Sequence, residues 1–369
     1  TFAVNGTDYS GTVDNTGHFS ISVAGSDLKA DPDTQFTASV SHTDAAGNTG
    51  TSTVAYSYNV DTSINASADV NTAKEEQSPT STQGNVLTND DQNGTSVTTG
   101  DVVGTYGTFH FKADGSYIYE LDNSKVQSFA EGSIHDDHAT YTITDTAGNI
   151  TSASLKVSIE GTNDSPTLAV TNLAAKEDGL SVKGAATFTD VDATDTHAFT
   201  VSTMASGEGA VSIDATTGEY TFTPGKDFQT LAVGETKDVS FNVTINDGHG
   251  GTDTEKVTVT VTGTNDQPTI TAQSMSSNED SDYQFTAANF GFTDVDSTDT
   301  LDHISITSLP DAIQGQLLLN GSAVTANQEI KEADIAHLTF KPAANFNGDV
   351  QLSYTVNDGH SDSAPSTST

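Results

Sequence analysis

The sequence predicts an all-β fold built from tandem β-sandwich domains, and two observations carry this prediction. Apolar and polar residues alternate in short segments, so that one face of each strand is apolar; the residues on these faces are Phe109, Phe111, Tyr117 and Tyr119 in 108–121, and Val257, Val259 and Val261 in 256–263. Short motifs also return about one hundred residues later, as "GTNDSP" at 161–166 and "GTNDQP" at 263–268 do. Repeated strands at this interval are typical of an array of β-sandwiches.

The repeated motifs keep a common register along the chain. "KED" at 176–178 corresponds to "NED" at 278–280 and to "KEE" at 74–76. "FTDVDATDT" at 188–196 corresponds to "FTDVDSTDT" at 292–300, and further pairs join 243–250 to 354–361 and 141–149 to 39–48. We therefore expect four domains, of which the first lacks its opening strands, with the boundaries 1–62, 63–163, 164–265 and 266–369.

The composition restricts the partners of the chain. Its 369 residues carry 51 acidic and 12 basic side chains, a formal charge of −39, and no cysteine. Such a surface repels nucleic acid and anionic membranes, because both bind through Lys and Arg. The apolar runs are too short to span a bilayer, and the first residues lack the pattern of a signal peptide, so we expect a segment of a longer polypeptide that does not insert into a membrane.

A β-sandwich topology predicts where the acidic motifs meet. If the strands reverse direction one after another, the loops after the second strand and before the last strand return to the end that holds the linker. We therefore expect two linker groups, Asn163 and Asp164 with Asp190, Asp192, Asp195 and Asp247, and Asn265 and Asp266 with Asp294, Asp296, Asp299 and Asp358. Glu177 and the corresponding Glu279 should lie at the far end of their domains, facing the next junction. Weaker candidates before the second domain are Asp61, Asp90 and Asp145.

Carboxylates gathered at one junction favour a cation. Six to eight oxygen ligands suit Ca²⁺ better than Zn²⁺, which prefers nitrogen or sulfur. Asn and Asp also form turns without any metal, and a single one of these residues would favour that interpretation. Their coincidence at three predicted loops of two domains favours a calcium clamp between neighbouring domains.

Several longer segments resemble a known class of repeats. "VTINDGHGGTDTEKVTVTVTGTND" and "LTFKPAANFNGDVQLSYTVNDG" look like VCBS and cadherin-like repeats of large RTX-type bacterial surface adhesins, and "SHTDAAGNTGTSTVAYSYNVDT" in 1–62 resembles their bacterial Ig-like repeats. The resemblance implies Ig-like and cadherin-like sandwiches in an elongated array outside the bacterial cell, with calcium between them. The glycine-rich nonapeptide that names RTX proteins is absent from the sequence.

These features predict a calcium-rigidified extender of a secreted adhesin, which projects a distal adhesive domain for attachment to a host or abiotic surface or for biofilm formation. The alternative is a direct receptor-binding or glycan-binding module within 266–369, whose middle departs from the repeat pattern. We expect no enzyme, because the acidic groups recur in register and no nucleophile motif is present. His135 and His138 could bind a transition metal, but a solvated loop is the favoured interpretation of "IHDDH".

Overall fold

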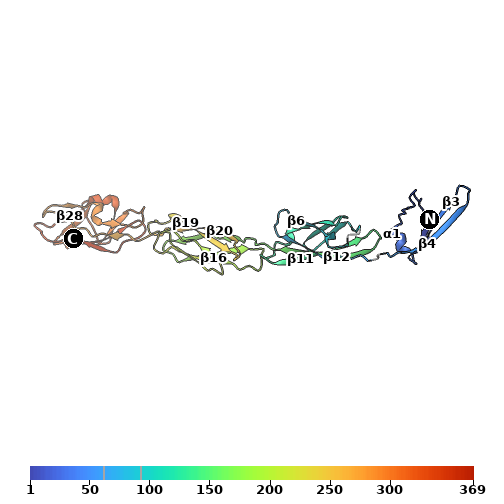
Figure 1. The fold of residues 1–369 in the computed structure, drawn as a ribbon. Coiled ribbons are helices and arrows are strands. Elements are labelled where there is room, and N and C mark those ends of the chain that lie inside the picture. Colours follow the sequence, from blue (N-terminus) through green and yellow to red (C-terminus); the bar gives the residue numbers. More distant parts are fainter. Residues whose placement is uncertain (61–62, 92–93) are drawn as a thin grey trace. The chain divides into compact units, whose positions relative to one another are not determined.

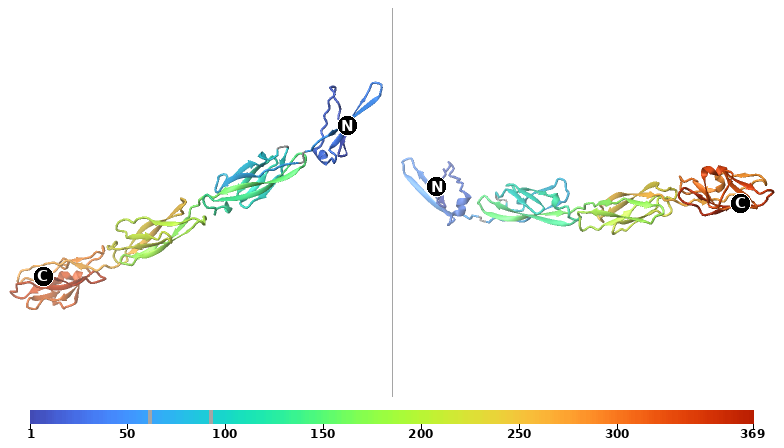
Figure 2. Two further views of the ribbon diagram at one scale, coloured as in Figure 1. Left: turned by 60° about the horizontal axis from the view of Figure 1, so that its bottom comes forward. Right: turned by 180° about the vertical axis from the view of Figure 1, so that it is seen from behind.

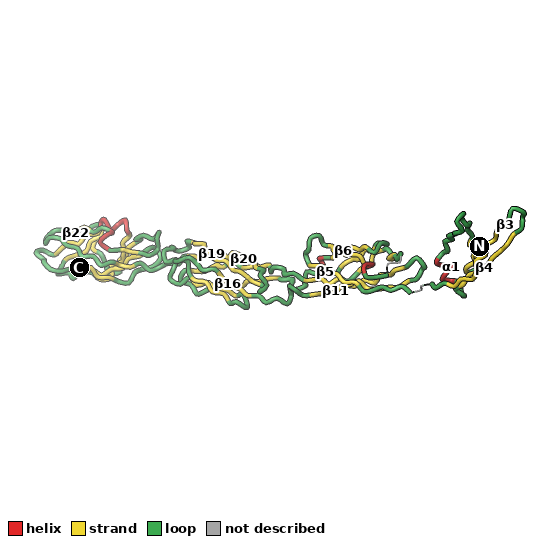
Figure 3. Tube along the Cα trace, viewed as in Figure 1, coloured by secondary structure: helices red, strands yellow, loops and turns green. Residues whose placement is uncertain are grey.

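The computed structural model describes residues 1–60, 63–91 and 94–369. The chain divides into two compact units, residues 1–164 with 190–195, and residues 165–189 with 196–369. Strands and loops make up most of both units, with a few short helices (Figure 3). The all-β prediction is therefore confirmed. Asp61, one of the candidate ligands, lies outside the described residues.

Residues 1–60 form two hairpins and one short helix. The elements are β1 (Phe2–Val4), β2 (Thr7–Tyr9), α1 (Gly25–Ala30), β3 (Gln35–Thr43) and β4 (Thr49–Ser57). Figure 2 shows β3 and β4 as a two-stranded ribbon. Phe2 and Val4 are the buried apolar residues of this range, whereas Val54 and Tyr56 are about half exposed (50% and 53%). Two strands alone bury little surface, so this range has no core comparable to those that follow.

The second domain is a sandwich of two four-stranded sheets (Figure 1). One sheet has the order β6-β10-β9-β8 and the other β5-β12-β11-β7. Phe109, Phe111, Tyr117 and Tyr119 are all buried between the sheets, as their alternation predicts. The elements are β5 (Asp69–Lys74), β6 (Ser81–Asn85), η1 (Val86–Thr88), β7 (Ser96–Val97), β8 (Gly100–Val103), β9 (Gly107–Phe111), β10 (Ser116–Leu121), η2 (Asn123–Lys125), β11 (Ile134–Thr144) and β12 (Ile150–Glu160).

The third domain repeats this architecture with sheets β13-β15-β18-β17 and β14-β20-β19-β16. Val257, Val259 and Val261 on β20 are fully buried, while the threonines between them are partly exposed. The elements are β13 (Thr167–Val170), β14 (Leu173–Lys176), β15 (Val182–Thr189), β16 (Ala198–Val201), β17 (Ala210–Ile213), β18 (Glu219–Thr223), β19 (Thr236–Asn246) and β20 (Thr252–Thr262). The short strand β14 pairs in parallel with β20, so both strands end at the same end of the sheet.

The fourth domain has sheets β22-β28-β25-β26 and β27-β24-β29-β30, with the pair β21-β23 beside them. Its middle departs from the third domain, because β27 and a 3₁₀ helix replace part of the repeat pattern. The elements are β21 (Thr269–Ile270), β22 (Tyr283–Gln284), η3 (Ala287–Phe290), β23 (Phe292–Thr293), β24 (His303–Ser308), β25 (Gly315–Leu319), β26 (Ser322–Ala323), β27 (Gln328–Lys331), η4 (Glu332–His337), β28 (Leu338–Pro342), β29 (Leu352–Asn357) and β30 (Ser366–Ser368).

The "IHDDH" segment is part of β11 and not a solvated loop. Successive strand residues point to opposite faces, so His135 and His138 do not converge on one metal ion. Asp137 is buried between them and accepts hydrogen bonds from the backbone N–H groups of Thr105 (2.8 Å) and Tyr106 (2.9 Å). The sequence reasoning missed this strand because its charged residues hid the alternation.

Candidate metal centre

The acidic loop after β23 is folded by its own aspartates. Asp296 donates its backbone N–H to Asp294 Oδ1 (3.0 Å), and Asp299 donates its N–H to the carbonyl oxygen of Asp296 (3.2 Å). This is the turn that Asp favours, with the side chain accepting from the backbone two residues later. Asp192 makes the same bond to Asp190 Oδ1 (3.0 Å) in the third domain. The spacing of the motif therefore holds its carboxylates close together.

The linker residues before the fourth domain are tied to its loops. Asp266 donates its backbone N–H to Asp296 Oδ2 (2.9 Å). The side-chain amide of Asn265 donates to Asp358 Oδ2 (3.1 Å) and to Ser361 Oγ (2.9 Å). The linker, the loop after β23 and the loop before β30 meet at one place, as the topology argument predicts.

Glu177 reaches the same place from the third domain. Because β14 runs parallel to β20, it delivers Glu177 to the end of the sheet where β20 stops, and Glu177 donates its N–H to the carbonyl oxygen of Thr262 (3.1 Å). Thr264 then donates its backbone N–H to Glu177 Oε1 (2.7 Å). The side chain is fully buried against the linker. This is the far-end position that the sequence predicts for it.

Two groups of carboxylate oxygens result. One oxygen each from Glu177, Asp266 and Asp296 lie within 4.8 Å of one another, and so do oxygens of Asp294, Asp299 and Asp358. Six carboxylates from four segments, one of them the linker itself, therefore gather at this place.

Several oxygens of the Glu177 group are buried without a hydrogen-bond donor. Among the residues that the structure describes, Glu177 Oε2, Asp266 Oδ2 and Asp296 Oδ1 have no such partner. Glu177 is 0% exposed and Asp296 is 2% exposed. A buried charged oxygen that is not hydrogen-bonded costs free energy unless a proton or a cation compensates it.

The same crowding changes how these groups bind protons. Burial raises the pKa of Glu177, and the charges of Asp266 and Asp296 add to the rise, although the hydrogen bonds from Thr264 oppose it. Burial is also the main cause of the raised pKa values of Asp266, Asp296 and Asp299, and neighbouring aspartates again contribute. The group is thus poised to take up positive charge, either protons or a metal ion.

The linker before the third domain has matching contacts within the first unit. Thr162 donates its N–H to Glu75 Oε2 (3.0 Å), and Asp164 donates its N–H to Asp192 Oδ2 (2.9 Å). Burial raises the pKa of Glu75 to about 7, with further contributions from Asp164 and Asp192. Glu75 was not among the predicted ligands, although the register of "KEE" with "KED" already marked it as the counterpart of Glu177.

The aspartates in the loop before the last strand of the third and fourth domains are held by backbone groups. Asp247 Oδ1 accepts N–H bonds from His249 (2.8 Å), Gly250 (3.0 Å) and Gly251 (3.0 Å), and its side chain is fully buried. Its counterpart Asp358 is held in the same way by the residues that follow it. By register, Asp190, Asp195 and Asp247 correspond to the Asp294 group, and Asn163 corresponds to Asn265; these four remain predicted ligands.

The other candidates belong to no group of three acidic side chains in the described part of the chain. Asp90 accepts hydrogen bonds from the Ser67 N–H (2.6 Å) and the Tyr141 hydroxyl (3.0 Å). Asp145 accepts from the backbone and the side-chain amide of Asn149, both at 2.8 Å. Glu279 is exposed and borders a groove of the fourth domain.

Models of known domain families match most of the chain. Residues 163–263 match the bacterial cadherin-like domain, residues 264–369 match the cadherin-like domain, and residues 60–158 match the bacterial Ig domain. The Ig match thus falls on the second domain, whereas the sequence resemblance placed Ig-like character in 1–62.

Individual relatives share only low sequence identity with this chain. The calcium-binding lectin RapA2 of Rhizobium johnstonii is 26% identical over 166 residues, which cover 42% of this chain and 70% of the lectin. The extracellular cadherin domains 1–5 of protocadherin gamma B2 align with all of this chain and 72% of theirs, at 13% identity and a TM-score of 0.54, which is a likeness of fold. A Ca²⁺-stabilised adhesin with which an Antarctic bacterium binds ice aligns with all of this chain and 88% of its own, at 20% identity and a TM-score of 0.37. Within the described residues, no helix is long and apolar enough to cross a membrane.

Proposed function

Because the chain is built of bacterial Ig, bacterial cadherin-like and cadherin-like domains, we propose that it is a calcium-rigidified extender segment of a bacterial surface adhesin. Calcium ions are its ligands, and they act at the linkers between neighbouring domains. The segment works outside the cell and projects an adhesive domain that lies elsewhere in the polypeptide toward a host or abiotic surface. Its role is structural and not enzymatic.

The observation that carries this proposal is the set of buried, unpartnered oxygens of Glu177, Asp266 and Asp296. Hydrogen bonds to protein donors leave one oxygen of each carboxylate without compensation. The three side chains of this group offer carboxylate oxygens to a metal, and none of them offers a nitrogen or sulfur ligand of the kind that zinc prefers. A hard cation with a large coordination number, such as Ca²⁺, fits this donor set.

The physical effect of the ion follows from the origin of its ligands. Two like charges about 4 Å apart repel each other by roughly 4 kcal/mol at an effective dielectric constant of about 20. Without a cation, this repulsion pushes Glu177 of the third domain away from Asp266 of the linker and Asp296 of the fourth domain. With a cation, the same three carboxylates are drawn together. The metal therefore converts a hinge into a stiff joint.

Small-angle X-ray scattering of the full chain tests the extender role. We expect the maximum dimension to be larger and the distribution of shapes narrower in 5 mM Ca²⁺ than in chelator, a concentration above the roughly 0.1–1 mM affinity of extracellular calcium modules. Glu177→Gln should behave at this calcium concentration more like the chelated protein, and the matched control Glu279→Gln should behave like the wild type. Identical scattering of the wild type with and without chelator would contradict the proposal.

A second candidate function is direct ligand binding by the fourth domain. The lectin name of the RapA2 relative supports it, and the fourth domain has a groove of about 480 Å³. A glycan array probed with the full chain in Ca²⁺ separates the two functions, because an extender binds no glycan. Binding that is lost on substitution of a groove residue, such as Asn347→Ala, would favour the lectin-like function.

A further inference from the structure

A second acidic residue follows each of the three glutamates at the ends of the sandwiches. These second residues are exposed, whereas Glu75 and Glu177 are buried. None of them belongs to the acidic groups found among the described residues. Their place in the repeat nevertheless puts them directly after the glutamate that faces the linker. They are Glu76, Asp178 and Asp280.

The loop before the second-last strand holds this residue at both linkers. Gln229 lies in the loop between β18 and β19, and its side-chain amide donates to Asp178 Oδ1 (3.0 Å). Gln127 stands 102 residues earlier, in the loop between β10 and β11. Its amide donates to Glu76 Oε1 and to Glu75 Oε1 (3.4 Å each). The same type of side chain therefore makes the same contact in two domains.

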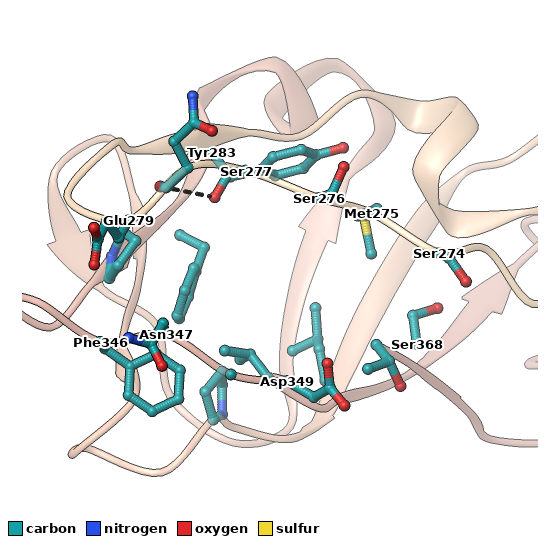
Figure 4. A pocket seen from close by; sticks show the side chains of 18 of the residues that line it. Ser274, Met275, Ser276, Ser277, Glu279, Tyr283, Phe346, Asn347, Asp349 and Ser368 are labelled. Carbon is teal, nitrogen blue, oxygen red and sulfur yellow. Dashed lines mark hydrogen bonds between the residues drawn. The ribbon is translucent and has the colours of Figure 1, made fainter.

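The fourth domain makes the contact through its backbone. Asn345, in the loop between β28 and β29, donates its N–H to Asp280 Oδ1 (2.9 Å). Figure 4 shows Glu279, which precedes Asp280, at the same end of the groove as Phe346 and Asn347 of this loop. The hydrogen bond to the second acidic residue thus recurs in all three sandwiches.

The loop that carries the glutamine is seated on the linker. Gly234 donates its N–H to the carbonyl oxygen of Gly263 (3.2 Å), and Gly263 donates its N–H to the carbonyl oxygen of Glu235 (2.8 Å). A side chain at Gly263 would overlap two carbonyl oxygens of the loop, and Gly161 is equally close to its own loop. The loop and the first linker residue therefore form one unit, which fixes the position of the glutamine relative to the linker.

The charge of the second acidic residue acts on the linker aspartate. Burial is the main cause of the raised pKa of Asp266, and the charge of Asp178 comes next, ahead of that of Asp294. For Asp164, burial is again the main cause of the raised pKa, and the charge of Glu76 follows it. The second acidic residue is thus a close electrostatic neighbour of the linker although it lies outside the ligand group.

We propose that Gln229 and Gln127 are positioning residues of the two linker sites. Each holds an exposed carboxylate, that of Asp178 or Glu76, beside the linker as an outer layer of negative charge for the calcium ion. An amide suits this task, because it orients a carboxylate without neutralising its charge, as a lysine would. A fixed outer carboxylate attracts the cation and accepts hydrogen bonds from metal-bound water. This inference rests on the proposed calcium function.

Hydrogen exchange of residues 264–266 gives a readout at one linker. The N–H groups of Thr264 and Asp266 bond to carboxylates of the Glu177 group, so calcium binding there should slow their exchange. We follow the calcium concentration of half-maximal protection in the full chain. Asp178→Asn should raise it about fivefold, the effect of one charge on a divalent ion about 8 Å away in water. Gln229→Ala should raise it by a smaller factor, because Asp178 keeps its charge but loses its position.

Two further measurements separate this role from a structural one. The double substitution should raise the half-maximal concentration no further than Asp178→Asn alone, since Gln229 acts through Asp178. The effect of Asp178→Asn should also shrink between about 0.1 M and about 1 M KCl, where the Debye length falls from about 10 Å to about 3 Å. Loss of a buried ligand in Glu177→Gln should persist at both salt concentrations.

The second linker and the fourth domain supply matched controls. Residues 162–164 should keep the wild-type calcium dependence in Asp178→Asn. Gln127→Ala should reverse the pattern, with a change at 162–164 and none at 264–266. Asp280→Asn removes the corresponding charge of the fourth domain and should change neither linker.

Three results would overturn the proposal. Asp178→Asn could leave the calcium dependence of residues 264–266 unchanged. Gln229→Ala could act as strongly in the Asp178→Asn background as in the wild type, which would make its role purely structural. The effect of Asp178→Asn could also persist at high salt, which would make Asp178 a direct ligand. Absence of calcium-dependent protection in the wild type would contradict the calcium proposal itself, and this inference with it.

Discussion

Asp296 and Asp145 are both loop aspartates beside a domain end, yet their surroundings are opposite. Asp145 accepts two hydrogen bonds from Asn149, and although burial opposes ionisation, these bonds and further backbone donors hold its pKa below the usual range. Asp296 is buried among other carboxylates, has one oxygen without a donor, and has a raised pKa. The difference teaches that the supply of donors, and not the number of acidic residues, separates a turn from a cation site.

Removal of calcium is expected to change the stability of the domains more than any substitution does. At a calcium concentration one hundred times the dissociation constant, each ion adds about 2.7 kcal/mol to the stability of the domains it joins. This corresponds to a rise of the melting temperature on the order of 10 °C for domains of about one hundred residues. Differential scanning calorimetry in 10 mM Ca²⁺ and in chelator measures it. Equal melting temperatures in the two conditions would contradict the assignment of the acidic groups to a metal.

Substitution of the glutamate that bridges to the linker is expected to have the next largest effect. Glu177→Gln removes one charge from the buried group and should remove a large part of the calcium-dependent rise in melting temperature. Glu279→Gln is the control, because Glu279 holds the same place in the repeat but is exposed and belongs to none of the acidic groups found among the described residues. The comparison fails if both variants lose the same calcium-dependent stabilisation.

The pH dependence of the calcium-free protein gives a smaller effect with a defined sign. Burial is the chief cause that raises the pKa of Glu75 from its ordinary value of 4.5 to about 7 in the folded protein. The folded state therefore binds the proton more tightly, so this contribution is full below pH 4.5 and is lost as the pH rises through 7. In chelator, the free energy of unfolding of the first unit should fall between pH 5 and pH 8.

Calcium and a Glu75 variant control this pH experiment. Because calcium stabilises the ionised carboxylates, its presence should flatten the fall. Glu75→Gln should reduce the fall in chelator. Urea denaturation at several pH values measures both, and a slope that is the same in wild type and Glu75→Gln would show that Glu75 is not the titrating group.

The smallest effect is expected for the hydrogen-bonded turn. Asp145→Asn keeps a side-chain oxygen that can accept from the Asn149 N–H, so the expected loss of stability is about 1 kcal/mol or less. The loss should be the same with and without calcium, since no cation is involved. Thermal unfolding with and without calcium measures this loss. A loss that depends on calcium would show that Asp145, like Asp296, takes part in cation binding.

The sequence alone predicted the two linker groups because their signal is local and repeated. The Asp-x-Asp loop, the linker Asn-Asp and the aspartate of the loop before the last strand each lie at a fixed sequence distance from a strand end, and the alternation of apolar residues predicts where those strands end. Glu75 was overlooked although its partner Thr162 belongs to the repeated motif at 161–166 and the register of 74–76 with 176–178 was visible in the sequence.

The prediction was weakest where partners come from elsewhere in the fold. Asp90 satisfies its oxygens with Ser67 and Tyr141, which are distant in sequence, and no pattern of acidic residues reveals this. The buried Asp137 is a similar case, because its donors lie on the loop between β8 and β9. The pairing of a short parallel strand such as β14 with the last strand is also non-local, so periodicity does not predict it.

Isothermal titration calorimetry of the metal-free full chain with Ca²⁺ tests the central claim most directly. Measured at pH 7 in two buffers of different ionisation enthalpy, it gives the number of ions bound and the protons released. We predict calcium binding at millimolar concentration or tighter, release of protons because carboxyl groups with raised pKa values must ionise, and weaker binding by Glu177→Gln. Absence of binding at millimolar Ca²⁺, or binding that Glu177→Gln leaves unchanged, would contradict the account.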